Sequence, residues 1–127
     1  MALTLSQPVV RTASDRSLQL ALAAAREAED NRGQDLVVLD MREQTTAFDY
    51  FVVATGTSNR QLRAMSDAID DVLQKGHAHR RLGREGYEQS HWILLDYGSV
   101  VVHLFDKNAR EFYRLEELWA GTTRVER

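Results

Sequence analysis

The sequence predicts a mixed α/β (α+β) domain in which helices cover a mixed sheet of about five strands, in the order α-β-β-α-β-β-β-α. Two segments, 18–28 and 62–73, carry apolar residues at helical spacing. Short apolar runs typical of strands lie at 35–40, 49–55 and 92–105. With 127 residues and 43% hydrophobic composition, the chain can form one domain with its own core.

The first helix is predicted from its apolar spacing and its terminal residues. It should span Asp15–Asn31, with Ser14 as its N-cap and Gly33 just beyond its end. Its apolar face is rich in alanine, which favours close packing on a sheet. The residues before it show no regular period. We therefore expect a flexible leader at 1–13, a single domain at 14–120 and a flexible tail at 121–127.

Two strands and a second helix should follow. The apolar runs Asp35–Asp40 and Asp49–Thr55 are typical of strands that are buried on both faces. The polar residues between them form a loop. Ser58, with Gln61 three residues later, matches a capping box, so the second helix should begin there. Its helical period continues to Gly76.

The segment Lys75–Arg84 holds the main concentration of positive charge. A solvated basic loop is the preferred interpretation, and a peripheral contact with ribosomal or other RNA phosphate is the alternative. His77 and His79 would point to one side of an extended chain, as two metal ligands must, but no third ligand is evident. No metal site is predicted. A short strand within Leu82–Tyr87 should lead into the next element.

Two apolar runs around a glycine predict a β-hairpin at 92–105. With Tyr97-Gly98 as a two-residue loop, Trp92 would pair with His103. Opposed residues share a face of the sheet, so the side chains divide into two sets. The aliphatic set, expected to face the core, comprises Ile93, Leu95, Val100, Val102 and Leu104. The mixed set comprises Trp92, Leu94, Asp96, Val101, His103 and Phe105.

A closing helix is expected after the hairpin. Asn108 is placed to cap it, and the helix should run to Trp119. Arg110 and Tyr113 would extend the mixed face if this helix lies beside the hairpin. The opposite stripe is expected to pack against the protein: Phe112, Leu115 and Trp119.

The mixed face of the hairpin has two interpretations. It is too polar for a sealed core and too apolar for an ordinary solvent-facing surface, which favours a binding site. Trp92 would then be its anchor, because tryptophan is enriched among residues that dominate binding energy. In the alternative, a helix covers this face and His103 is an internal histidine with its hydrogen bonds satisfied. The sequence alone leaves both open.

Composition excludes several classes of protein. The chain has no cysteine and therefore no disulfide or thiolate chemistry. No apolar run approaches the roughly 20 residues that a membrane span requires. A net charge of −3 argues against a protein that mainly coats nucleic acid. We expect a cytoplasmic protein without a membrane anchor.

The sequence contains two patterns that could support catalysis. Gly56-Thr57-Ser58 before a helix could hold a phosphate, as in nucleotidyltransferases, but the metal-binding Asp-x-Asp or Asp-x-Glu that such enzymes need is missing. Ser58 or Ser66 could meet His103 in space, although no Gly-x-Ser-x-Gly motif supports a nucleophile. We therefore expect no enzyme activity and no cofactor, with a nucleotide-binding enzyme as the alternative.

Several separated motifs occur together in this chain: Asp49-Tyr50-Phe51, Gly56-Thr57-Ser58-Asn59-Arg60-Gln61, Arg84-Glu85-Gly86, Trp92-Ile93-Leu94-Leu95-Asp96-Tyr97-Gly98, Val100-Val101-Val102-His103-Leu104-Phe105 and Arg110-x-x-Tyr113-x-Leu115-Glu116-x-Leu118-Trp119. In this order they resemble the signature of the ribosomal silencing factor family, RsfS or Iojap. The resemblance covers about 18–119, and several motifs in order are more specific than any single one.

The resemblance implies a nucleotidyltransferase-like fold that lacks catalytic carboxylates. It also implies binding to the fourteenth protein of the large ribosomal subunit (L-fourteen), which keeps the small subunit away when nutrients are scarce. An exposed docking face of this kind would also allow a homodimer. Carried onto this chain, the partner-binding residues would be Trp92, Asp96, His103, Phe105, Arg110 and Tyr113.

Overall fold

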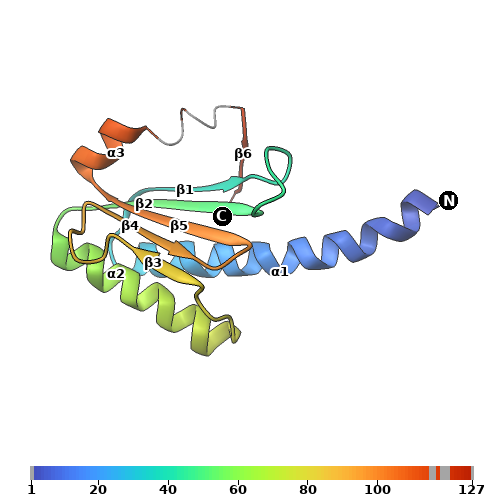
Figure 1. Cartoon of the computed structure of the whole chain (residues 1–127), viewed down its shortest axis with the longest axis horizontal. Coiled ribbons are helices and arrows are strands. Elements are labelled where there is room, and N and C mark those ends of the chain that lie inside the picture. The colour runs from blue at the N-terminus through green and yellow to red at the C-terminus, as the bar shows by residue number, and fades with distance from the viewer. Residues whose placement is uncertain (1, 115–116, 118–120, 127) are drawn as a thin grey trace.

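The computed structural model describes residues 2–114, 117 and 121–126. Its elements are α1 (Ala2–Asp30), β1 (Gln34–Asp40), β2 (Tyr50–Gly56), α2 (Asn59–Asp71), the π-helix η1 (Val72–Gly76), β3 (Gly83–Glu85), β4 (Trp92–Asp96), β5 (Val100–Asp106), α3 (Lys107–Tyr113) and β6 (Thr123–Arg124). Figure 1 shows how they are arranged in space.

The strands form one mixed six-stranded sheet in the order β3-β4-β5-β2-β1-β6. β2 and β5 pair in parallel, whereas the other neighbours pair antiparallel. Parallel pairing needs a crossover, and the chain between β2 and β5 supplies it through α2, β3 and β4. The predicted mixed α+β fold is therefore confirmed. The additional strand, β6, comes from the segment 121–127, where no strand was predicted.

Helices α1 and α2 lie on the same side of the sheet (Figure 1) and close the main core. Ala21, Ala24, Ala25 and Ala28 of α1 are buried, and their small side chains let the helix approach β2 closely. From α2, Leu62, Met65, Ser66 and Ile69 are buried. These two helices therefore cover one face of the sheet.

Helix α1 is longer than predicted. It begins at Ala2 rather than Asp15, so Ser14 lies within the helix and is not its N-cap. The predicted helix start was wrong. The first part of α1 extends beyond the sheet, and its later part packs across the strands (Figure 1). The flexibility expected of residues 1–13 stays a prediction.

The start of α2 is capped as predicted, because the Ser58 hydroxyl oxygen accepts a hydrogen bond from the Gln61 amide at 3.1 Å. The Gln61 side chain has a different partner from the one a capping box provides. It accepts from the Thr57 N–H at 2.6 Å and donates to the carbonyls of Asn31 and Arg32. These bonds join the start of α2 to the end of α1.

The hairpin of β4 and β5 forms with a different register from the predicted one. Trp92 lies opposite Phe105, two residues further along β5 than His103, so the predicted pairing was wrong. A shift by two residues returns every side chain to its predicted face. The aliphatic row is buried against α1 and α2, as predicted: Ile93, Leu95, Val100, Val102 and Leu104.

Tyr97 explains the change of register. Its side chain is 1% exposed and continues the inward-facing row of β4, where its hydroxyl donates to Asp70 of α2 at 2.8 Å. Placing Tyr97 in a loop would expose a large ring and break that bond. The turn therefore closes through the Tyr97 N–H and the Val100 carbonyl, with Gly98–Ser99 as the loop.

The last helix, α3, is capped by Asp106 and not by Asn108, because the Asp106 side chain accepts from the Ala109 amide. Arg114 adopts a left-handed conformation just after Tyr113, where the described helix ends. The expected packing of Phe112 was wrong, since its side chain is 79% exposed. The other members of the expected stripe, Leu115 and Trp119, lie outside the described residues.

Candidate functional site

The second face of the sheet, opposite α1 and α2, carries the mixed row of the hairpin. A smaller hydrophobic cluster lies there, built by β1, β2 and β5 with Met41 just after β1 and Ala109 of α3: Val37, Leu39, Met41, Phe51, Val53, Phe105 and Ala109. Among the described helices, only α3 packs on this side, where it contacts β5 and β2. Within the described part of the chain, most of the face over β4 therefore has no covering helix.

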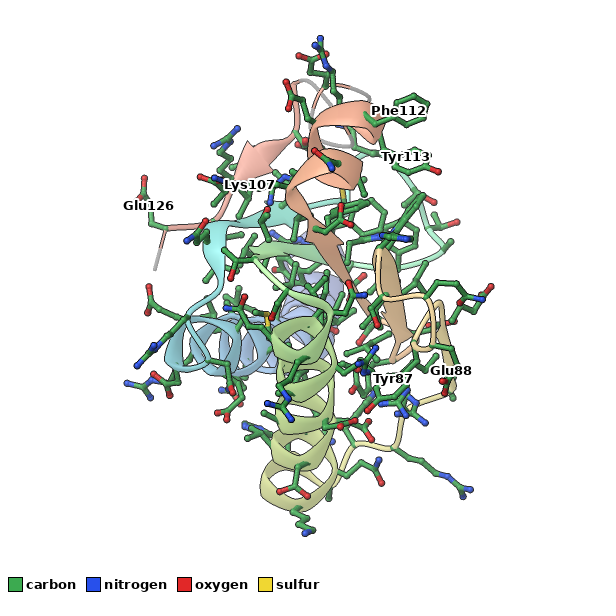
Figure 2. The ribbon with its side chains drawn as sticks, turned by 90° about the vertical axis from the view of Figure 1, so that its left-hand side faces the viewer. Tyr87, Glu88, Lys107, Phe112, Tyr113 and Glu126 are labelled. Atoms are coloured by element: carbon green, nitrogen blue, oxygen red, sulfur yellow. The ribbon has the colours of Figure 1, made fainter. Side chains whose placement is uncertain are left out.

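An aromatic cluster lies where α3 meets the hairpin. The ring centroid of Trp92 is 4.9 Å from that of Phe105 and 4.7 Å from that of Tyr113. Phe105 is buried beneath the other two, while Trp92 is half-buried and Tyr113 is 45% exposed. Phe112 and Tyr113 project outward from the end of α3 (Figure 2). The cluster thus combines a rigid base with exposed rings.

His103 connects this cluster to the centre of the sheet. The Trp92 indole N–H donates to His103 Nδ1 at 3.0 Å, and Phe51 meets the imidazole edge-on at 4.6 Å. Burial lowers the pKa of His103 to about 4, so the ring is neutral near pH 7. A neutral imidazole that accepts at Nδ1 carries its proton on Nε2. The indole is therefore held in place by an uncharged, buried acceptor.

Helix α3 is tied to the sheet at its start. Burial alone would raise the pKa of Asp106, but hydrogen bonds from the Ala109 amide and the His91 ring outweigh burial and lower it. Further along the helix, Arg110 donates to the Thr55 hydroxyl and to the Asp35 carbonyl, both at 2.7 Å. These contacts fix the direction in which α3 presents Tyr113.

A pocket of about 570 Å³ lies on the same face, beside the aromatic cluster. Its lining includes Leu94, Asp96 and His103 from the hairpin. Phe48, from the connection between β1 and β2, stacks on Phe51 at 4.5 Å along its side. The mixed face therefore has two parts, the exposed aromatic cluster and this pocket.

The structure brings together four of the six predicted partner-binding residues. Trp92, His103, Phe105 and Tyr113 form one cluster, although His103 and Phe105 are buried and support the surface from below. The other two lie apart from it. Asp96 is at the far end of β4 beside the pocket, and Arg110 points to β1 and β2.

The two interpretations of the mixed face each describe part of it. Trp92 and Tyr113 lie at a surface that α1 and α2 do not cover, whereas His103 is an internal histidine at 4% exposure. The sequence did not identify Phe48 or Phe51 as neighbours of this face. Phe51 lies there because β2 pairs with β5, and no local pattern in either strand encodes that pairing.

The loop considered for nucleotide binding uses its polar groups internally. The amide of Thr57 and its hydroxyl both donate to the Gln61 side chain. On α2, Asp67 accepts from Arg84 and Tyr87, and Asp70 accepts from Tyr97. These groups are engaged in holding β3 and the hairpin to α2.

The basic stretch is also largely paired within the protein. Arg81 lies 3.0 Å from Asp70, and Lys75 lies 2.9 Å from Asp71. His79 Nε2 is 2.9 Å from the Tyr97 carbonyl oxygen. Within the described part of the chain, no group of three or more His, Asp or Glu side chains is arranged to hold a metal ion. No helix in that part is long and apolar enough to cross a membrane.

Comparisons with known proteins identify the family. The family model described as "Ribosomal silencing factor during starvation" matches residues 14–127. Ribosomal silencing factor RsfS of Halalkalibacterium halodurans is 39% identical over 110 residues, which cover 86% of this chain and 90% of that protein. The chloroplastic protein Iojap of Zea mays is 32% identical over 120 residues, which cover 94% of this chain and 52% of the maize protein.

A solved structure agrees with these sequence matches. The crystal structure of a protein from Chromobacterium violaceum aligns with a TM-score of 0.77 and 36% sequence identity, covering 84% of this chain and 88% of that one. The two chains therefore share one overall fold. The chain belongs to the ribosomal silencing factor family, RsfS/Iojap.

Proposed function

We propose that this protein binds the large ribosomal subunit through L-fourteen and sterically blocks the small subunit, so that translation is repressed when nutrients are limited. The observation that carries the proposal is the partly exposed aromatic cluster around Trp92, in a chain of this family. Exposed aromatic rings on a packed base are typical of residues that dominate protein–protein binding. No chemical step is required, because a bound protein of this size excludes a competing surface by volume alone.

The proposed binding residues form two groups, those at the surface and those that support the surface from below. Trp92 and Tyr113 would touch the partner, and Asp96 would meet it at the end of β4. His103 and Phe105 would act from below by holding the Trp92 ring in position. Arg110 would act by orienting α3 through its bonds to Thr55 and Asp35. The proposed function takes place in the cytoplasm.

The direct experiment replaces Trp92 with glutamate and measures co-sedimentation with purified large ribosomal subunits. A carboxylate among the rings would be desolvated on binding, so affinity should fall by at least about thirtyfold, which corresponds to roughly 2 kcal/mol. Gln19→Glu is the matched control, because it adds a carboxylate at an exposed position of α1 on the other side of the sheet. Binding by W92E equal to that of Q19E would refute the proposed surface.

The blocking step has its own measurement. Purified subunits are mixed at a magnesium concentration that favours whole ribosomes, and the products are separated on a sucrose gradient. The unmodified protein should leave subunits apart in proportion to its binding, while W92E should not. Full subunit joining in the presence of saturating unmodified protein would contradict steric blocking, even if binding itself is intact.

Two further partners are proposed from the same structure. The exposed rings would allow two free copies to pair, and light scattering should then show a dimer that W92E converts to a monomer. Ribosomal RNA would be a peripheral partner, through the exposed Arg80 in the connection between η1 and β3 and its neighbours. Because Arg81 and Arg84 are paired within the protein, Arg80→Ala should weaken subunit binding much less than W92E.

A further inference from the structure

A residue that lines the pocket beside the aromatic cluster has a buried hydrogen-bond donor without a partner among the described residues. His103 lines this pocket, while its Nδ1 is occupied by the Trp92 indole, which is not part of the lining. The Nε2 atom is buried and has no hydrogen-bond partner among the described residues. Leaving a buried donor unpaired is unfavourable by about 1–3 kcal/mol, so native proteins rarely keep one without a use.

The rest of the pocket has the character of a site for one apolar side chain. Phe51, Leu94 and Val101 form its apolar base, and Phe48 stands at one side. Leu82 adds an apolar group at the rim and is itself 72% exposed. Phe48 belongs to a connection rather than to a strand, so this wall can shift to admit a guest more readily than the base can.

The rim of the pocket is acidic. Asp96 and Glu85 are both among its lining residues, and none of the described lining residues is a lysine or arginine. One oxygen of Asp96 accepts from the Gly98 amide at 2.8 Å, which holds the carboxylate at the mouth of the pocket. A positively charged group on a bound molecule would therefore be attracted to this edge.

We propose that this pocket receives a segment of the partner protein in which an apolar side chain enters the cavity, its backbone carbonyl accepts from His103 Nε2–H, and an adjacent Lys or Arg pairs with the Asp96–Glu85 rim. The inference rests on the proposed function, because the pocket continues the surface formed by Trp92. It adds the chemistry by which the partner is selected. A neutral donor in an apolar wall suits a neutral acceptor, which a peptide carbonyl provides.

The test uses two substitutions, each of which keeps one hydrogen-bonding position of the imidazole and removes the other. His103→Asn keeps an acceptor close to the position of Nδ1 for the Trp92 indole and removes the donor at Nε2. His103→Gln keeps a donor close to Nε2 and removes the acceptor at Nδ1. We expect H103N to bind purified large subunits, and isolated L-fourteen, about tenfold more weakly. H103Q should lose clearly less than H103N, because it keeps the donor and only loosens the Trp92 ring. His77→Asn, on the helical side of the sheet, is the matched control and should bind normally.

The results separate the two proposals. If W92E loses binding while H103N binds as tightly as H77N, the pocket inference is overturned and the proposed function stands. If H103Q loses as much binding as H103N or more, the Nε2 donor is not what the partner requires, which also overturns the inference. If W92E itself binds normally, the proposed function fails first. Urea unfolding of each variant identifies any loss that comes from misfolding.

A measurement on the unmodified protein avoids substitutions at His103 altogether. In nitrogen-15 NMR, the His103 Nε2 proton should move downfield and exchange with water at least tenfold more slowly when isolated L-fourteen is bound. Exchange at the rate of the free protein would overturn the inference.

Glu85→Gln tests the acidic rim of the pocket: it should weaken binding about threefold at low salt and not at high salt. Equal binding by E85Q and the unmodified protein at low salt would refute the proposed pairing of a partner Lys or Arg with the rim.

Discussion

Alternate residues of the same two strands form the two faces of the β4–β5 hairpin, yet the faces differ in both polarity and burial. The face toward α1 and α2 is aliphatic and fully buried, with Tyr97 as its polar exception. The opposite face combines indole, imidazole and carboxylate groups, and much of it is half-buried. The first face packs within the chain, whereas the second is the face that we propose binds a partner. Because side chains alternate along β4 and β5, one face of this strand pair packs in the core and the other carries the proposed binding site.

Leu94 and Leu95 are adjacent on β4 and provide the largest contrast between the faces. Leu95 is fully buried, so Leu95→Ala should lower the free energy of unfolding by about 2–5 kcal/mol. Leu94 is only partly buried on the pocket side, so Leu94→Ala should cost about 1 kcal/mol or less. Urea denaturation measures both. Equal losses would mean that the pocket side is as tightly packed as the core.

His103 should make stability depend on pH in a narrow window. Burial lowers its folded pKa to about 4 from 6.5, so the unfolded chain takes up the proton first as the pH falls. Stability that is present above pH 6.5 should be lost as the pH falls toward 4, by roughly 3 kcal/mol at most. Asp40 and Asp106, whose pKa values are lowered, lose their contributions only at more acidic pH.

The control for this pH effect is H103Q, which has no titrating ring. Its unfolding free energy should change little between pH 7 and 5, while that of the unmodified protein declines. Parallel declines in both proteins would show that another group titrates in this range, and would remove the support for a buried, neutral His103.

Phe112 should show the smallest effect on folding. Because its side chain is 79% exposed, Phe112→Ser should change the free energy of unfolding by less than about 0.5 kcal/mol. If the partner covers α3 as well as β4, the same variant should bind large subunits several-fold more weakly. Thermal unfolding and co-sedimentation check the two parts. A large loss of stability would mean that Phe112 packs on the protein after all.

Much of the fold could be predicted because alternation and helical period are local properties. The division of the hairpin into two faces survived an incorrect register, since a shift by two residues preserves the face of each side chain. The Ser58 cap was likewise predicted from a local pattern. Tyr97 was assigned to the loop because glycine follows it, while its burial against Asp70 depends on α2, far away in sequence.

The site was harder to predict, because tertiary pairing decides which residues meet. The pairing of β2 with β5 places Phe51 beside His103, and it brings Thr55 to the level of Phe105, where Arg110 reaches it. The pocket, the tautomer of His103 and the free Nε2–H follow from these contacts. Strand β6 has only two residues and no hydrophobic pattern, so nothing in the sequence marked it.

The central claim is that the partner covers the second face of the sheet, and side-chain footprinting with hydroxyl radicals tests it most directly. Phe112 and Tyr113 lie at one end of the molecule, far from Tyr87, which bonds to Asp67 of α2 (Figure 2). On binding to large ribosomal subunits, Trp92, Phe112 and Tyr113 should become protected from oxidation while Tyr87 stays reactive. Protection of Tyr87, with Trp92 and Tyr113 as reactive as in the free protein, would contradict the account.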